Sequence, residues 1–382
     1  MIELQALFRS FGRAVKGRLT DRRPAAIGLH LGDHGLHLVQ FDSAGPTPVL
    51  RAATSARHGM DRQGLLNSPA LLRDCLAQAF KSQRFRGRRV VTCLPPEHLK
   101  MSVIDYHVPA GSHEEEAVVQ QAQARVEGGL EQWVVDYVPV RTSEYDTGER
   151  SALLAMAPRT AVLEYLQRLQ AARLEVAALE IGPVAIARLV TRLSLGGQAT
   201  EVLVVNFGKE STYLTIISGR RLMLDRMVRF GEKRLLAELQ GALEVDAEAA
   251  SALVYRYGVV TQATAAVVGS DLTPSPSIPG TVAGILRPVF KVLCGEIAKI
   301  LIYHASQVHG KSVDGVYLLG SVARWPGIEQ MLEGLLSLRV ATLNPLASFA
   351  ESQQLMGRTD LDPVADLAIA TGCALREATG RG

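Results

Sequence analysis

The sequence has few cysteines, almost no net charge and no long apolar run. Its four cysteines are scattered and form no CxxC pair, which disfavours a disulfide framework and favours a reducing compartment. Lys plus Arg exceed Asp plus Glu by only 41 to 38, an excess too small for a nucleic-acid footprint. No stretch approaches the roughly 20 apolar residues of a membrane-spanning helix, and the start lacks the order of a signal peptide. These absences predict a soluble cytosolic protein that does not bind nucleic acid.

The N-terminal segment, residues 1–24, carries a pattern of its own. Apolar residues recur at helical spacing with basic residues between them. The apolar residues are Leu4, Phe8, Phe11, Val15 and Leu19. The pattern predicts a basic amphipathic helix within residues 1–23 that lies on an anionic membrane surface or docks on a partner. A plain N-terminal extension without such a role is the alternative.

The body of the chain alternates strand patterns with helix patterns, which predicts an α/β architecture. The meander that starts with IGLHLG, residues 27–32, is repeated by LVVNFG, residues 203–208. Each is followed by a polar turn and a second strand, so that His30 aligns with Asn206 and Gly32 with Gly208. Two matched meanders predict an internally duplicated protein.

The expected domain boundaries follow from this duplication. The first half covers residues 25–195, with an inserted subdomain at about 90–160, and the second half covers residues 196–382. Residues 261–280, rich in Thr, Ser and Pro, are expected to form a flexible connector in the second half.

Local signals predict where several helices begin. Ser112 is expected to cap a helix with Glu115 completing a capping box, and Thr160 to cap the helix over 160–173. A long helix is expected from about Thr281 to Val308, with Pro288 in or near its first turns.

The order of motifs resembles the PilM family of type IV pilus assembly proteins, over roughly residues 25–380. The matching pieces are IGLHLGDHGLHLVQFD, VVTCLPPE, EEEAVVQQAQARVE, VVDYVPV, VNFGKESTYLTII, LLGSVARWPGIEQML and the NP of ATLNP. The resemblance implies an actin-like fold of the sugar kinase, Hsp70 and actin type. It also implies a cytoplasmic adaptor, peripheral at the inner membrane, that binds the short cytosolic tail of a PilN-like membrane protein in its first domain. Strand addition or groove docking would capture that peptide. Self-association in a ring is a further expectation from the family.

The same resemblance implies an ATP site in the interdomain cleft, where glycine-bearing turns approach the nucleotide. The candidate residues are Gly32, Asp33, His34, Gly35, Asn206, Gly208, Lys209, Glu210, Ser211, Gly231, Lys233, Arg234, Gly320, Ser321 and Val322. The alternative for any one of these glycines is an ordinary hairpin position, and for Lys209 a solvated turn lysine.

Magnesium chemistry fits this sequence poorly. Mg²⁺ prefers carboxylate, phosphate and water oxygens, whereas the two motif positions carry the imidazole of His30 and the amide of Asn206. Asp33 is nearby but shifted into the turn. We therefore expect a degenerate cleft in which ATP binding is weakened or lost, Mg²⁺ has no ligand set and hydrolysis is negligible.

No catalytic alternative emerges from the sequence, which has no GxSxG elbow, HExxH pair or Walker loop. The basic run KSQRFRGRR, residues 81–89, is expected to be a charged surface loop and not a nucleic-acid site. Two other functions stay open: an active actin-like ATPase or small-molecule kinase, which would need Asp33 or another carboxylate to replace the missing pair, and a membrane-surface filament former held by residues 1–23.

Overall fold

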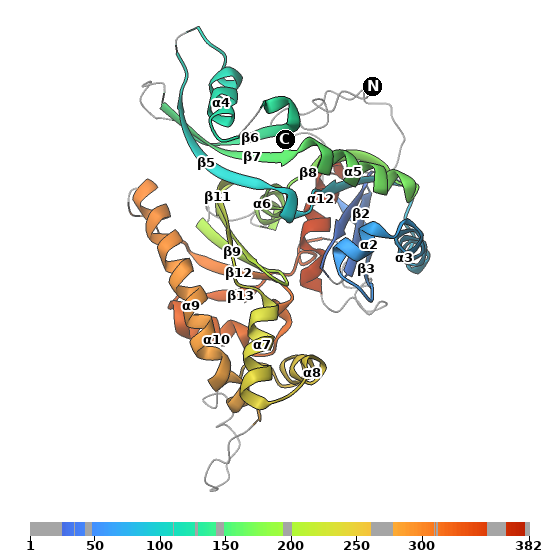
Figure 1. The fold of residues 1–382 in the computed structure, drawn as a ribbon, viewed down its shortest axis with the longest axis vertical. Helices are drawn as coiled ribbons and strands as arrows, with labels where there is room; N and C mark the ends of the chain where they lie inside the picture. The colour runs from blue at the N-terminus through green and yellow to red at the C-terminus, as the bar shows by residue number, and fades with distance from the viewer. Residues whose placement is uncertain are drawn as a thin grey trace, which may run out of the picture. The chain divides into compact units, whose positions relative to one another are not determined.

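The computed structural model of this chain describes residues 25–33, 35–42, 48–109, 111–126, 129–142, 149–193, 201–260, 278–308, 310, 312–349 and 364–378. The expected N-terminal helix, most of the expected connector, and His34 lie outside the described residues. The chain divides into two compact units (Figure 1). Unit 1 comprises Met1–Gly197, Arg220–Asp225 and Asn344–Gly382, and unit 2 comprises Gln198–Gly219 and Arg226–Leu343. None of the described helices has both the length and the apolar character needed to cross a bilayer.

The core of unit 1 is a five-stranded sheet with the order β3-β2-β1-β4-β8. Its strands are β1 (Ile27–Leu31), β2 (Gly35–Asp42), β3 (Val49–Arg57), β4 (Arg89–Cys93) and β8 (Glu175–Glu180). The first three form an antiparallel meander, and β4 and β8 follow in parallel beside β1. The meander predicted from the sequence is therefore present.

A second sheet, which belongs to unit 2 except for the first part of β11, repeats this layout with the order β11-β10-β9-β12-β13. Its strands are β9 (Glu201–Phe207), β10 (Thr212–Ser218), β11 (Arg221–Val228), β12 (Gly315–Gly320) and β13 (Val340–Thr342). As in the first sheet, the first hairpin is antiparallel and the last two strands run parallel to its first strand. The duplication expected from the two meanders is confirmed at the level of strand order.

The two hairpins also match residue by residue. Leu31 pairs with Leu36 and Phe207 pairs with Thr212, so residues 32–35 and 208–211 form equivalent turns. His30 in the first hairpin and Asn206 in the second therefore occupy the same register position, one residue pair further from the turn. The alignment of these two residues made from the sequence is confirmed.

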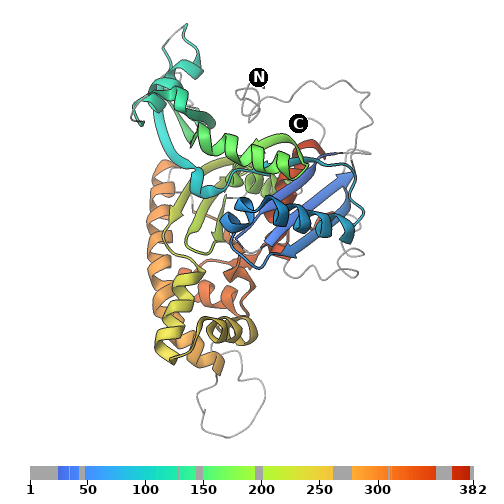
Figure 2. The same ribbon diagram turned by 45° about the vertical axis from the view of Figure 1, so that its right-hand side comes forward.

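Helices cover both faces of the first sheet. They are α2 (Arg62–Asn67), α3 (Pro69–Ser82), α5 (Arg159–Ala171), α6 (Gly182–Leu193) and α12 (Ala368–Ala378). Ile27 and Leu29 of β1 pack in one apolar cluster with Leu72 of α3, while Ala26 belongs to another cluster with Cys373 of α12. Figure 2 shows α3 lying across the strands β1 to β3. Because side chains alternate along a strand, each face acquires its own helices.

The position of α12 differs from the sequence expectation, which assigned residues up to 382 to the second half. The helix packs on β1, β2 and α6 and belongs to unit 1. A Cβ atom on Gly28 would lie only 1.9 Å from the carbonyl oxygen of Ala370, so β1 and α12 approach more closely than a side chain would permit. Propensity and periodicity carry no information about such a long-range contact.

A three-stranded antiparallel sheet, with the order β5-β7-β6, lies in the chain between β4 and α5. It consists of β5 (Lys100–His107), β6 (Trp133–Thr142) and β7 (Glu149–Pro158), and α4 (Glu114–Gln123) packs on it. Ile104, Leu154 and Val118 share one apolar cluster between sheet and helix. Strands β6 and β7 pair as an antiparallel hairpin.

Two predicted helix caps are wrong. Helix α4 begins at Glu114 with His113 as its N-cap and no capping side chain, because the Ser112 amide bonds to the Pro109 carbonyl in a preceding turn. Helix α5 begins at Arg159, which places Thr160 inside the helix. Helix α4 therefore begins after a backbone turn and helix α5 begins after Pro158, and neither start uses a capping hydroxyl group.

Four further helices belong to unit 2: α7 (Glu232–Leu243), α8 (Ala247–Tyr257), α9 (Ile278–Gln307) and α10 (Ile328–Leu336). Helix α9 starts earlier than the sequence predicted, so Pro288 lies inside it and not in its first turns. Pro288 itself is exposed, while Leu286 and Phe290 beside it are buried in unit 2. The helix thus keeps its apolar face despite the proline.

Candidate functional site

Most of the candidate nucleotide-binding residues fall on three turns that each follow a central strand, and Asn206 lies near the end of β9. The first turn, residues 32–35, joins β1 to β2 in unit 1. The second turn, residues 208–211, joins β9 to β10, and the third turn, residues 320–322, leads from β12 into the short helix η4 (Val322–Arg324). The second and third turns both belong to unit 2, together with the candidates Gly231, Lys233 and Arg234 at the start of α7.

The first turn packs against a buried histidine. Its ends are closed by a hydrogen bond from the Gly32 amide to the Gly35 carbonyl, 2.8 Å long. A Cβ on Gly32 would lie 3.0 Å from Nε2 of His37, and a Cβ on Gly35 would lie 2.9 Å from its Cε1. The His37 ring is buried, and its Nδ1 lies 2.9 Å from the Ser55 hydroxyl. Both glycines thus have a packing reason that is internal to the protein.

His30, the residue at the metal-ligand position of the motif, stacks on His37 with ring centroids 5.5 Å apart. Burial lowers the pKa of His30 well below its usual value, and His37 and Arg62 lower that pKa further. Its buried Nδ1 has no hydrogen-bond partner among the described residues. At this position the chain therefore offers a neutral imidazole and no anionic oxygen.

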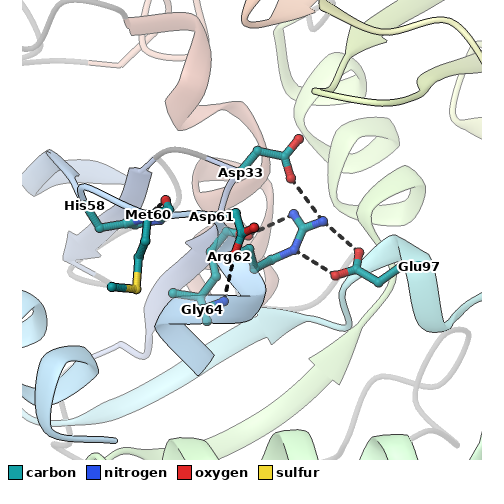
Figure 3. A network of polar contacts seen from close by, with 8 residues as sticks. Asp33, His58, Met60, Asp61, Arg62, Gly64 and Glu97 are labelled. Carbon is teal, nitrogen blue, oxygen red and sulfur yellow. Dashed lines mark hydrogen bonds and ion pairs between the residues drawn. The ribbon is translucent and has the colours of Figure 1, made fainter. Parts of the chain in front are cut away.

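Asp33, the carboxylate shifted into the first turn, is held by an arginine. Its Oδ1 lies 3.1 Å from Nη2 of Arg62, and Arg62 also binds both carboxylate oxygens of Glu97 (Figure 3). Arg62 is the first residue of α2, and the side chain of the preceding Asp61 caps this helix through the Gly64 amide. Asp33 is thus engaged by a cation of the protein itself.

The second turn is held by the start of α7. The Gly208 amide donates to the Ser211 carbonyl at 2.9 Å, the equivalent of the bond in the first turn. The amides of Glu232 and Lys233 donate to the carbonyls of Gly208 and Lys209. The first amides of a helix are its natural anion donors, and here the turn itself accepts two of them.

Four other candidates beside the second turn have contacts within unit 2. Lys233 and Glu210 form an exposed ion pair of 2.8 Å. A Cβ on Gly231 would lie 2.3 Å from the Lys209 carbonyl oxygen, so this glycine permits the contact between turn and helix. Arg234 lies over the Phe230 ring at 5.6 Å.

The third turn lies against the end of β9. Gly320 has φ +82°, and a Cβ there would lie 2.0 Å from the Phe207 carbonyl oxygen and 3.0 Å from Oδ1 of Asn206. The Ser321 amide donates to the same Phe207 carbonyl at 3.1 Å. The Ser321 hydroxyl is buried and has no hydrogen-bond partner among the described residues, and Val322 is fully buried. The structure therefore brings the candidates at Asn206 and at 320–321 together.

A buried polar network joins α7, α8 and the third turn. The Tyr255 hydroxyl donates to Oε1 of Glu232 at 2.6 Å and accepts from Nη2 of Arg324 at 2.9 Å. Arg324 also donates to the Ser321 carbonyl. Burial and the Glu232 charge raise the pKa of Tyr255, so its proton stays in place. Glu232 itself is buried, although it is the first residue of α7.

The donor set does not fit a magnesium site. Positions 30 and 206 carry an imidazole and an amide, Asp33 is paired with Arg62, and no carboxylate lies at either motif position. Across the described ranges, no group of three or more His, Cys, Asp or Glu side chains is arranged to hold a metal ion.

Comparison with known proteins places this arrangement in a family. The family model for the type IV pilus assembly protein PilM matches residues 28–263. The chain belongs to the PilM family. A search among curated proteins finds no match.

Two solved structures show how far the likeness extends. One, of a PilM–PilN type IV pilus biogenesis complex, contains a chain 25% identical to this one with a TM-score of 0.73. The alignment covers 94% of this chain and 99% of that one. The ethanolamine utilization protein EutJ from Carboxydothermus hydrogenoformans is 15% identical, with a TM-score of 0.52 and coverage of 92% and 89%. The actin-like α/β fold and the resemblance to PilM expected from the sequence are confirmed.

Sequence reasoning missed the residues that hold these turns. Arg62, His37 and Tyr255 act through side-chain contacts with residues of other elements. Only His37 lies within a motif segment, and that motif does not indicate its contacts. The capping signal at Asp61 was the only local hint that Arg62 begins a helix.

Proposed function

We propose that this PilM family protein is a cytoplasmic adaptor of type IV pilus assembly that binds the short cytosolic tail of a PilN-like membrane protein. The observation that carries the proposal is the likeness to a chain of a PilM–PilN complex over 94% of this protein. An adaptor needs a rigid surface that binds a peptide, and it needs no catalytic residues. Self-association in a ring, implied by the family resemblance, stays a prediction.

The edge of β5 in the three-stranded sheet is the surface best suited to strand addition. Both β5 and β6 are edge strands, and no other described strand pairs with their outer sides. Strand β6 contains Pro139 and a shift of register beside it, which interrupts its row of backbone donors. Strand β5 pairs with β7 without interruption from Lys100 to His107, so it offers an even template for a peptide.

Amide hydrogen exchange tests this assignment directly. A synthetic peptide with the N-terminal cytosolic sequence of a PilN-like protein should slow exchange in residues 100–107 more than in residues 133–139. A scrambled peptide of the same composition is the control. Binding without protection of β5 would reject the surface, and absence of binding would reject the adaptor proposal.

We also infer that the nucleotide turns of this protein do not support ATP hydrolysis. The support is the neutral pair His30 and Asn206, together with the ion pair that engages Asp33. ATP turnover in the presence of Mg²⁺ should stay far below ~1 s⁻¹, an ordinary enzyme rate. Turnover near that rate would contradict the inference.

Introducing carboxylates at positions 30 and 206 distinguishes two cases. In one, the turns still bind phosphate but lack metal ligands; in the other, they no longer bind nucleotide. The double variant His30→Asp, Asn206→Asp should bind Mg²⁺–ATP more tightly than the parent if the turns still accept phosphate. An unchanged affinity would mean that the turns no longer bind nucleotide. The parent chain and each single variant are the controls.

A further inference from the structure

The loop that follows α3 displays a row of cations that the adaptor function leaves unexplained. Lys81 lies in the last turn of α3, and Arg84, Arg86 and Arg88 follow before β4 begins. All four side chains are exposed. We refer to residues 81–88 as the basic loop.

The basic loop has a fixed backbone. The Gln40 side chain is fully buried and bonds to both the amide and the carbonyl of Arg86, at 2.8 and 2.9 Å. Phe85 packs against the core cluster of unit 1 and meets Phe80 edge-on, and Arg88 lies 3.9 Å above the Phe80 ring. The arginines are therefore exposed on a segment whose backbone is already anchored. Binding an anion then costs little backbone conformational entropy.

The cations of the basic loop differ from their neighbour Arg89 in lacking a carboxylate partner within the part of the chain that the structure describes. No carboxylate among the described residues forms an ion pair with Lys81, Arg84, Arg86 or Arg88. The next residue, Arg89, is different: it donates two hydrogen bonds to Glu377, at 2.5 and 2.6 Å. Within the described residues, the positive charge of the basic loop is thus not opposed by a paired carboxylate.

The basic loop also lies where the N-terminal segment enters the fold. The Gln40 amide that bonds to the Arg86 carbonyl donates as well to the carbonyl of Ala25, at 2.8 Å. The sequence before Ala25 carries the cations Arg9, Arg13, Lys16, Arg18, Arg22 and Arg23. Gln40 thus ties the basic loop to Ala25, the residue that directly follows the basic N-terminal sequence.

We propose that the basic loop is a docking surface for the anionic headgroups of a lipid bilayer. The chemistry is that of a polybasic patch, in which each Lys or Arg near an anionic membrane surface contributes independently. A nucleic acid is less well matched, because Phe85, the aromatic residue of the loop, packs inward and is not free to stack on bases. The inference rests on the proposed function in one respect, since that function places the protein beside a membrane.

Co-sedimentation of the full chain with vesicles tests the proposal. Vesicles of phosphatidylcholine mixed with phosphatidylglycerol should bind the protein, and vesicles of phosphatidylcholine alone should not. The variant Arg84→Gln, Arg86→Gln, Arg88→Gln should bind the anionic vesicles on the order of 100-fold more weakly, at about fivefold for each charge. Binding by the parent chain should also weaken as salt is added.

A matched variant controls for net charge. Arg229, Arg287 and Lys291 are exposed cations of unit 2, and replacing all three by Gln removes the same charge. This variant should keep most of the vesicle binding. Equal losses in both variants, or no loss in the basic-loop variant, would overturn the proposal.

Two further measurements, of DNA binding and of peptide binding, show which proposal is wrong when an expected result is not obtained. If the basic-loop variant loses binding to a short DNA duplex but not to anionic vesicles, the lipid assignment is overturned. Titration with the PilN-like peptide is run on the same proteins, because that titration reports on the adaptor function alone. If the parent chain does not dock on anionic vesicles but still binds the peptide, this inference is overturned and the proposed function stands.

Discussion

Arg188 donates two hydrogen bonds to the carboxylate of Glu180, at 2.7 and 2.8 Å, inside unit 1. Glu180 at the end of β8 has no exposed side-chain area, and Arg376 of α12 contacts the same carboxylate. One buried anion therefore links a strand to helices α6 and α12.

Replacing this anion should destabilise the protein strongly. Glu180→Ala leaves two guanidinium groups without their partner, and the free energy of unfolding should fall by about 3–5 kcal/mol. Urea unfolding followed by circular dichroism measures the change. The control is Glu164→Ala, which removes an exposed partner of Arg168 and should cost no more than about 0.5 kcal/mol. A similar small loss in both variants would show that Glu180 is not an organising charge.

His30 should make stability depend on pH. Its pKa in the folded protein lies well below 6.5, whereas in the unfolded chain it is near 6.5, so the unfolded state binds more protons between these values. The free energy of unfolding should therefore rise with pH from the folded pKa up to about 6.5. His30→Asn should reduce this slope, and replacement of the exposed His107 by Gln should leave it intact. Urea unfolding at a series of pH values measures the pH dependence of the free energy of unfolding. An identical pH dependence in the parent chain and both variants would contradict the prediction.

The contact between Gly35 and His37 can be measured by a double-mutant cycle. Gly35→Ala places a methyl group against the imidazole ring and should cost about 1–3 kcal/mol, the usual range for overpacking. In a His37→Ala background the same change should cost clearly less, because the ring is gone. Unfolding midpoints of the four proteins provide the coupling energy. Additive effects would indicate that Gly35 is required for a reason other than His37.

Tyr255 should contribute to the stability of unit 2 through its hydroxyl. Tyr255→Phe removes the donor to the buried Glu232 and the acceptor for Arg324, which should cost about 1–3 kcal/mol. Tyr303→Phe, at an exposed position of α9, should have almost no effect. Thermal unfolding of the two variants provides the comparison, and equal melting temperatures would argue against a structural role for this network.

Much of the fold could be predicted because its signals are local. The alternation along β1 and β2, the glycine-bearing turns and the repeat of the meander are properties of short segments. They placed His30 and Asn206 at equivalent positions, as the strand registers confirm.

What could not be predicted depends on contacts distant in sequence. Glu232 looked like one of three exposed charges, yet Tyr255 of the next helix buries it and bonds to it. Asp33 looked like a spare carboxylate, and the charge that engages it comes from the start of α2. Whether the candidate site binds a nucleotide stays a prediction, since the sequence signal for it consists of glycines that packing alone can explain.

The bond between Glu377 and the Ala26 amide, together with the Glu377–Arg89 pair, has a consequence for how the chain is made. On the ribosome, the strands of the first sheet are synthesised well before α12, so this sheet must wait for its last covering helix. Unit 1 should therefore complete its folding only after α12 has left the ribosome, and a ribosome-bound chain that ends before residue 344 should expose the face of β1 that α12 covers.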